Sequence, residues 1–244
     1  MTKPTSGHPN SGFMVGSGRK AKAQKILEII SESLLLNHPQ GYRPKLLDIG
    51  TGNGEIAFHL GKEYEVFSVD IIDQRQIYNG YSFTRLENEI LPFPNQSFDI
   101  IVSNHIIEHV VNADLHLAEI SRLIRDDGLV YLATPNRLWP WEVHYRIFFL
   151  HYLPAPIFLL LMKRLDRYHE DVFLINWFSL NQKITKDFIL ISFSERICKW
   201  PHQYYMNCTQ TIARLLSYCP LWLYRFFTFI HPTFVVVLRK KSKN

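Results

Sequence analysis

The sequence has little of several features that define small secreted, zinc-bound or membrane-spanning proteins. Only 3 cysteines occur among 244 residues and none forms a CxxC pair, so neither a disulfide scaffold nor a cysteine zinc site is expected. The apolar stretches 147–162 and 221–238 are broken by proline, histidine or arginine and fall short of the roughly 20 apolar residues of a membrane span. Residues 1–20 lack the apolar core of a signal peptide. These absences predict a cytoplasmic protein with a flexible N-terminal arm over residues 1–20.

Acidic residues are missing from the last part of the chain. The net charge is +5, yet residues 196–244 hold eight lysines and arginines and no acid. Aromatic residues also gather late, with 23 of 34 from Trp139 onward. This composition favours an apolar or lipid-linked partner molecule and contact with the inner face of a membrane. The alternative is that the aromatic side chains pack in the core or in an enclosed pocket. The basic residues form no dense stripe, so no nucleic-acid partner is expected.

The middle of the chain alternates short apolar runs with helical patterns. Strands are expected at residues 45–49, 64–71, 81–86, 98–104 and 129–135, helices at 21–36, 55–63 and 113–124, and a turn at 126–128. Further along, the expected elements are apolar helices within 139–168, a strand at 187–193, a helix at 212–229 and a strand at 233–239. Strand, helix and strand at this spacing predict an α/β fold with a parallel sheet and helices on both faces.

A glycine-rich loop follows the first expected strand. Gly50, Gly52 and Gly54 stand at alternate positions, with Asp48 two residues before the first of them. Glycines permit positive φ and close approach of a ligand, and open α/β sheets bind ligands at the carboxyl ends of their strands. A dinucleotide loop reads GxGxxG; the GxGxG pattern here favours a neutral or cationic nucleoside ligand. A nicotinamide-dependent oxidoreductase and a non-catalytic protein of the same fold are the alternatives.

Asp70 ends the second expected strand, 16 residues after Gly54. A carboxylate at this position can accept hydrogen bonds from both hydroxyls of a ribose. The alternative is that Asp70 only caps the strand end.

His105, Glu108 and His109 form an H-x-x-E-H pattern, which is the inverted zinc-protease motif. Two histidines and a glutamate are reasonable zinc ligands. The pattern directly follows a strand, however, and no distal third ligand is evident. We therefore expect no metal, and structural hydrogen bonding by Glu108 and His109.

Four segments, LLDIGTGNGE, VFSVD, LPFPNQSFDIIVSNHIIEHV and LAEISRLIRDDGLVYLATPN, follow one another in residues 45–136. Over this range the chain resembles class I S-adenosylmethionine-dependent methyltransferases of the type 11 group, which includes quinone-biosynthesis methyltransferases. The resemblance implies a Rossmann-like seven-stranded sheet whose last strand, TFVVVLR, is reversed, with a helical insertion or lid. It implies S-adenosylmethionine as cofactor and methyl transfer to a small-molecule or lipid-linked acceptor.

The resemblance also implies a role for each part of the cofactor site. The implied contacts are Asp48, Gly50, Gly52 and Gly54 around the methionine part, Asp70 on the ribose, Ile71, Glu87 and Asn88 at the adenine, and Ser103, Asn104 and His105 beside the sulfonium. An aspartate is more usual in the family at the position of Glu87 and Asn88.

The acceptor side is expected to begin after the fifth strand. Glu142 and His144 lie there and are candidate components of a general base; the alternative is that they anchor the loop. The expected division of the chain is a flexible arm (1–20), a cofactor-binding core (21–136), an acceptor-side insertion or lid (137–187) and a C-terminal part (188–244) that completes the sheet and carries an apolar, basic helix.

Overall fold

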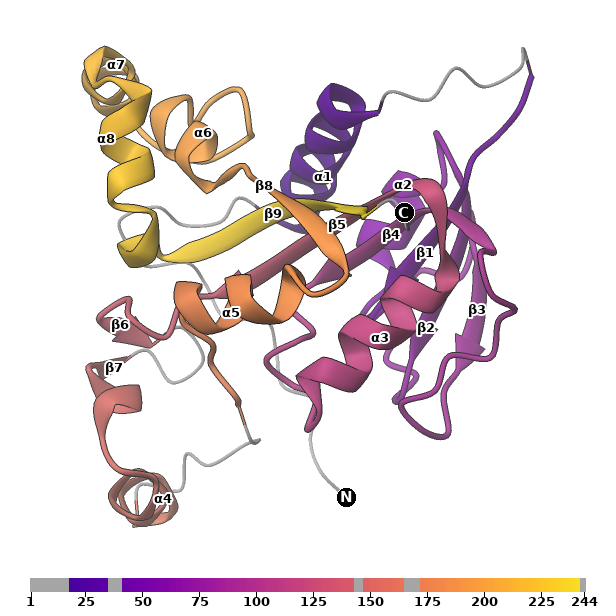
Figure 1. The fold of residues 1–244 in the computed structure, drawn as a ribbon, viewed down its shortest axis with the longest axis horizontal. Coiled ribbons are helices and arrows are strands. Elements are labelled where there is room, and N and C mark those ends of the chain that lie inside the picture. The colour runs from indigo at the N-terminus through magenta and orange to yellow at the C-terminus, as the bar shows by residue number, and fades with distance from the viewer. Residues whose placement is uncertain (1–17, 35–40, 143–146, 165–171, 242–244) are drawn as a thin grey trace.

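The computed structural model describes residues 18–34, 41–142, 147–164 and 172–241. One large sheet forms its centre (Figure 1). The strands of this sheet are β1 (Lys45–Ile49), β2 (Glu65–Asp70), β3 (Ser82–Arg85), β4 (Phe98–Asn104), β5 (Ile124–Pro135), β8 (Phe188–Ser192) and β9 (Thr233–Lys240). The helices packed around it are α1 (Arg19–Ser33), α2 (Glu55–Leu60), α3 (Ala113–Leu123), α5 (Trp177–Ile184) and α6 (Ser194–Lys199).

A second group of elements lies at the left side of the molecule in Figure 1, away from β3. Its members are β6 (Trp141–Glu142), β7 (Ile147–Phe148), the short 3-10 helix η1 (Leu150–Tyr152), α4 (Ala155–Arg164), α7 (Gln210–Tyr218), α8 (Leu221–Phe226) and the 3-10 helix η2 (Thr228–Ile230). The expected apolar helix within 139–168 is α4, which follows a two-stranded β6–β7 ladder. No helix in the described parts of the chain is long and apolar enough to cross a bilayer.

The strand order of the main sheet is β3-β2-β1-β4-β5-β9-β8. Neighbouring strands from β3 to β5 run parallel, whereas β9 is antiparallel to both β5 and β8. The segment TFVVVLR therefore supplies the reversed strand, and the expected seven-stranded Rossmann-like sheet is confirmed. Its parallel half places the carboxyl ends of β1, β2 and β4 at one edge, where the glycine loop leaves β1.

Helices cover both faces of the sheet because strand residues alternate between two buried clusters. Leu47 packs on the face covered by α3 and α5, where Ile120 and Leu180 are buried. Leu46, the preceding residue, packs on the face covered by α1, α2 and α6, beside Ile26. Figure 1 shows α3 and α5 on one side of the strands and α1 and α2 on the other.

The turn expected at residues 126–128 is wrong, because β5 runs without interruption from Ile124. Its pairing with β4 shifts between Phe98, opposite Ile124, and Ile100, opposite Leu129. The extra residues of β5 are accommodated by this irregularity, which is how a polar D-D-G stretch can lie within a strand.

The range 212–229 is helical as expected, but it is divided into α7 and α8 at Pro220. Proline has no N–H to continue the first helix and is well suited to the start of the second. Lys199 donates to the carbonyl oxygens of Ser217 and Cys219 and so holds the turn between them.

Candidate cofactor and active site

The glycine loop gives each of its glycines a positive φ. The values are +86° at Gly50, +54° at Gly52 and +84° at Gly54. A side chain at Gly50 would collide with Ile106, and one at Gly54 would collide with Tyr81. Above Gly52, in contrast, only the guanidinium tip of Arg19 comes near. Gly50 and Gly54 are thus needed for packing within the protein, and Gly52 is the glycine whose open face suits a ligand.

Asp70 lies directly beside this open face. One oxygen of its carboxylate accepts a hydrogen bond from the backbone N–H of Gly52 (2.9 Å), and the other accepts from that of Ile72 (3.2 Å). The structure therefore brings together two residues that the sequence predicts as cofactor contacts. It adds a third, because Arg19 at the start of α1 donates to the side-chain oxygen of Asn53 in the same loop (2.6 Å).

Asp48 lies beneath the loop and is only 3% exposed. Its carboxylate accepts a hydrogen bond from Ser68 (2.7 Å), whose hydroxyl lies 2.6 Å from that of Thr51. Burial raises the pKa of Asp48 to about 7, and the negative charge of Asp70 adds to the rise. Asp48 can therefore influence a ligand through its charge rather than by direct contact.

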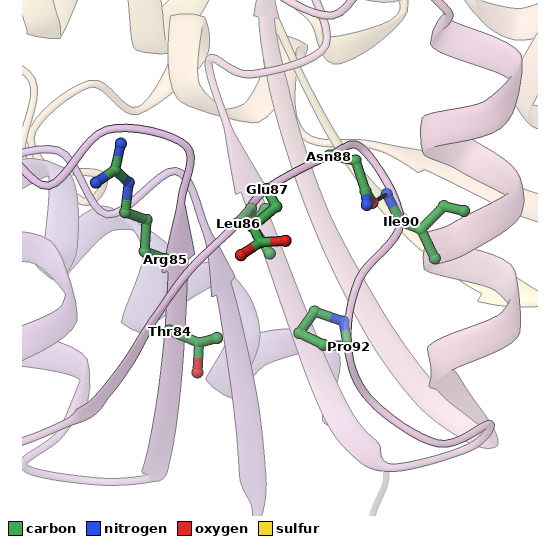
Figure 2. A pocket seen from close by; sticks show the side chains of 7 residues that line it. All are labelled: Thr84, Arg85, Leu86, Glu87, Asn88, Ile90 and Pro92. Carbon is green, nitrogen blue, oxygen red and sulfur yellow. Dashed lines mark hydrogen bonds between the residues drawn. The ribbon is translucent and has the colours of Figure 1, made fainter.

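A hollow of about 460 Å³ continues the site past Asp70, lined by Ile71, Arg85, Leu86 and Glu87. A second hollow of about 230 Å³ shares three of these residues and extends to Pro92. Figure 2 shows that one continuous stretch of chain, from Thr84 onward, supplies its side chains. Ile71 is 56% exposed, so its apolar surface is free to pack on a ring. The predicted adenine contacts Ile71, Glu87 and Asn88 thus line one or both of the hollows.

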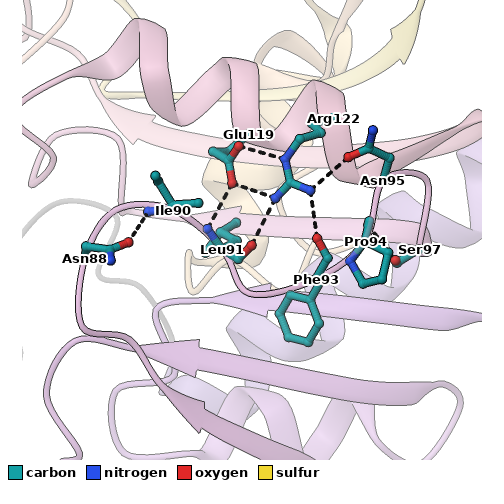
Figure 3. Close-up of polar contacts among 9 residues, drawn as sticks. All are labelled: Asn88, Ile90, Leu91, Phe93, Pro94, Asn95, Ser97, Glu119 and Arg122. Atoms are coloured by element: carbon teal, nitrogen blue, oxygen red, sulfur yellow. Dashed lines mark hydrogen bonds and ion pairs between the residues drawn. The ribbon is translucent and has the colours of Figure 1, made fainter.

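The segment 91–95, at the end of the second hollow, is held in place by an ion pair on α3 (Figure 3). Arg122 makes two hydrogen bonds of 2.8 Å to the carboxylate of Glu119. Its guanidinium also donates to the carbonyl oxygens of Leu91 (2.9 Å) and Phe93 (2.7 Å). Glu119 in turn accepts from the N–H of Leu91 (2.9 Å). The pair thereby anchors the rim of the hollow to a core helix.

The carboxyl end of β4 carries the three residues predicted to lie beside the sulfonium. Ser103 is fully buried, and its hydroxyl is 3.0 Å from Nε2 of His116 on α3. The side chain of Ser103 therefore points to α3, and Ser103 pairs with Ile49 of β1 and Leu132 of β5, so neither its side chain nor its place in the sheet offers a contact to a ligand. Asn104 and His105 are partly exposed. His105 has a φ of +62°, a left-handed conformation that turns the chain sharply out of the strand.

Of the predicted general-base residues, His144 lies outside the described residues, and only the backbone of Glu142 is described, in β6. In the described residues, no group of three His, Cys, Asp or Glu side chains is arranged to hold a metal. Within the H-x-x-E-H pattern, His105 and Glu108 are joined by a hydrogen bond of 3.2 Å.

The comparisons with known proteins agree with this geometry. Residues 19–180, about two thirds of the chain, match a family model described as a methyltransferase domain. The chain belongs to this family, and its fold is that of the class I S-adenosylmethionine-dependent methyltransferases. S-Adenosylmethionine is the cofactor of this class, and a nicotinamide cofactor is not favoured.

Individual relatives match over parts of their length. The chain is 29% identical over 105 residues to a ubiquinone biosynthesis O-methyltransferase of Bartonella bacilliformis, covering 39% of this chain and 42% of the relative. It is 33% identical over 93 residues to the mitochondrial arginine-hydroxylase NDUFAF5 of Rattus norvegicus, covering 35% and 27%. The chain thus spans less than half the length of these relatives. Phosphoethanolamine N-methyltransferase 2 of Haemonchus contortus, solved with S-adenosyl-L-methionine, shares the fold at 14% identity, with a TM-score of 0.51 over 91% of this chain and 52% of that chain.

The residues present suit S-adenosylmethionine. The open face above Gly52, the carboxylate of Asp70 and the hollow beside Ile71 follow one another across the ends of β1, β2 and β3. Arg19, which sequence reasoning missed, adds a cation at the glycine end. The sequence does contain a pattern that points to this cation. Basic residues recur every three positions at Arg19, Lys22 and Lys25, which places them on one side of α1.

Proposed function

We propose that this protein transfers a methyl group from S-adenosylmethionine to a small-molecule acceptor. The observation that carries the proposal is the continuous site formed by the open face of Gly52, the adjacent carboxylate of Asp70 and the hollow lined by Ile71 and Glu87. A ligand with a methionine part, a ribose and a flat ring would meet these features in that order.

Each part of the site has a separate task. When bound, S-adenosylmethionine supplies an electrophilic methyl group on a positively charged sulfur. Asp70 would accept hydrogen bonds from the ribose hydroxyls, and Ile71 would pack on the adenine. Asp48 would contribute negative charge near the sulfonium. The main contribution of the protein would be to hold donor and acceptor in line, which lowers the entropic part of the barrier.

Calorimetric titration tests the cofactor assignment. We expect S-adenosylmethionine and S-adenosylhomocysteine to bind with one site per chain, and NAD not to bind. Asp70→Ala should abolish or strongly weaken binding. Asp73→Ala is the matched control, because Asp73 is an acid three residues away whose carboxylate pairs with Arg75 at the surface. Equal loss in both variants, or tight binding of NAD, would contradict the assignment.

We further propose that the acceptor is apolar or lipid-linked and that the protein meets an anionic membrane surface, at the inner face of a membrane. The support lies in α7 and α8, neither of which has a buried residue. Large apolar side chains are exposed along them and in the following turn, at Leu215, Tyr218, Trp222, Phe226, Phe227 and Ile230. The exposed Arg214 and Arg225 flank them, and acids are absent from residues 196–244. Exposed aromatics with basic neighbours suit an interface with anionic headgroups.

Flotation with vesicles tests this surface. Wild-type protein should float with phosphatidylglycerol-containing vesicles at low salt and less with phosphatidylcholine vesicles. The double variant Trp222→Ser, Phe226→Ser should remain at the bottom of the gradient. Val111→Ser removes an apolar side chain that is 80% exposed elsewhere and serves as control. Failure of the wild type to float would reject the membrane proposal.

A further inference from the structure

His105 is held by a buried carboxylate at the mouth of the cofactor site. Its Nδ1 lies 3.2 Å from Oε1 of Glu108. Glu108 is fully buried, and its second oxygen accepts a hydrogen bond from the hydroxyl of Thr134 (2.9 Å). Burial is the largest single influence and raises the pKa of Glu108, but the hydrogen bond and charge of His105, together with the hydrogen bonds from the backbone and Thr134, lower the pKa overall. An ionised Glu108 requires a proton on Nδ1 of His105, which fixes the tautomer of a neutral imidazole.

This arrangement leaves Nε2 of His105 as the acceptor nitrogen. Among the described side chains, none is hydrogen-bonded to Nε2. The ring is one third exposed, so its free nitrogen can be reached from the mouth of the site. The φ of His105 is +62°, in the left-handed region that residues other than glycine rarely adopt, and such strain is concentrated at functional positions.

Two lysines on α1, Lys22 and Lys25, lie near enough to His105 for their charges to act on its imidazole. Burial lowers the pKa of His105, Glu108 partly opposes this, and the charges of Lys22 and Lys25 lower the pKa further, so the ring is neutral at pH 7. Burial and the charge of Lys22 lower the pKa of Lys25 to about 8. In the described structure neither lysine has a hydrogen bond or an ion pair. Unpaired, partly buried cations at this place suit a negative charge that is supplied by a bound molecule.

We propose that His105, oriented by Glu108, is the general base of the reaction and that the acceptor presents a weakly acidic hydroxyl, such as a phenol, whose anion is stabilised by Lys22 and Lys25. This inference rests on the methyltransferase function proposed above and specifies its substrate class. A neutral imidazole can deprotonate a phenol, whose pKa is about 10, far more readily than an aliphatic alcohol.

The step balances without any further reactant. The hydroxyl proton passes to Nε2 of His105 while the acceptor oxygen forms its bond to the methyl carbon. The carbon–sulfur bond breaks, and its electron pair stays on the sulfur as a neutral thioether. The imidazolium then returns its proton to water. Glu108 stabilises the imidazolium, and the two lysines stabilise the developing oxyanion.

Nitrogen NMR of the S-adenosylhomocysteine complex tests the orientation. We expect His105 to be neutral at pH 7.5 with its proton on Nδ1. Glu108→Gln should shift the proton toward Nε2 or mix the tautomers. A proton on Nε2 in the wild type would overturn the proposal.

A chromophoric phenol, 4-nitrocatechol, tests the base and the acceptor class. Added to the S-adenosylhomocysteine complex at a pH about two units below its own pKa, where the free probe is neutral, it should bind and show the phenolate spectrum. His105→Gln should restore the neutral spectrum, and Lys25→Gln should raise the apparent pKa of the bound probe. Lys20→Gln, at an exposed position of the same helix, should leave the spectrum unchanged.

The outcomes separate the two proposals. If S-adenosylhomocysteine itself does not bind, the proposed function fails. If it binds but the probe does not, or if phenolate persists in His105→Gln, the assignment of His105 is wrong while the cofactor site stands.

Discussion

Replacing Asp48 with asparagine should stabilise the protein above pH 7 while weakening cofactor binding. Asp48 is buried beneath the glycine loop, and burial raises its pKa from 3.8 to about 7. The folded protein therefore holds one more proton than the unfolded chain between these two pH values. Stability contributed by this protonated carboxyl is fully present near pH 4 and declines as pH rises toward 7.

The size of the effect follows from the shift. About three pKa units at roughly 1.4 kcal/mol each give a loss of up to about 4 kcal/mol by pH 7 and above. Asparagine keeps an oxygen for the hydrogen bond from Ser68 but adds an amide N–H₂ that needs partners, at a cost of roughly 1–3 kcal/mol. We therefore expect Asp48→Asn to be equal to or less stable than wild type at pH 4.5 and about 1–3 kcal/mol more stable at pH 8.

Urea unfolding from pH 4.5 to 8.5 measures this difference. Asp127→Asn is the control, because Asp127 is exposed and its replacement should shift the curve little at any pH. A constant difference between wild type and Asp48→Asn across this range would refute the reasoning. The same variant should lose affinity for S-adenosylmethionine more than for S-adenosylhomocysteine, because only the former carries a positive sulfur.

Three further predictions address the cofactor, the rim of the hollow and the core. Asp70→Ala should weaken S-adenosylmethionine binding at least tenfold in calorimetry, because up to two charged hydrogen bonds of roughly 1.5–3 kcal/mol each are lost; Gly52→Val should do similar damage by filling the open face, and unchanged affinity in either would contradict the site. Arg122→Met should lower the free energy of unfolding by about 1–3 kcal/mol and speed proteolysis within residues 91–95, because Glu119 loses its partner; a resistant loop would argue against the anchor. Burial lowers the pKa of His116 to about 4, so stability is lost as pH falls from about 6.5 to 4, by up to about 3 kcal/mol; His116→Gln should remove that part of the pH dependence of urea unfolding, and an unaltered slope would oppose it.

Most strands of the sheet could be predicted from the sequence because each is marked by its own short run of apolar residues. The apolar run before Gly50 and the reversed strand TFVVVLR each carry enough apolar, β-branched residues to identify a buried strand. The turn expected at residues 126–128 failed because a bulge opposite Phe98 absorbs the polar residues, and that pairing partner lies far away in sequence. The helical stretch expected over 212–229 is interrupted at Pro220, which has no N–H to continue the first helix.

The part of the candidate site that could be predicted consists of residues whose position after a strand already indicates their role. Gly52 and Asp70 follow directly from their positions at strand ends. The link between His105 and Glu108 was visible as a spacing of three, yet its geometry depends on Thr134, which arrives from β5. Arg19 contacts the glycine loop only because the start of α1 packs beside it, a tertiary placement that no local pattern reveals.

The position of β9 has a consequence for how the chain folds. This strand lies between β5 and β8, although almost one hundred residues separate it from β5 along the sequence. Until Thr233–Lys240 has been synthesised, β5 presents an unpaired apolar edge, which is a site for association with other chains. Closing so long a loop is slow, so the nascent protein depends on its last strand both to finish the sheet and to protect it. A chain truncated before Thr233 should accumulate as aggregate rather than as a smaller folded domain.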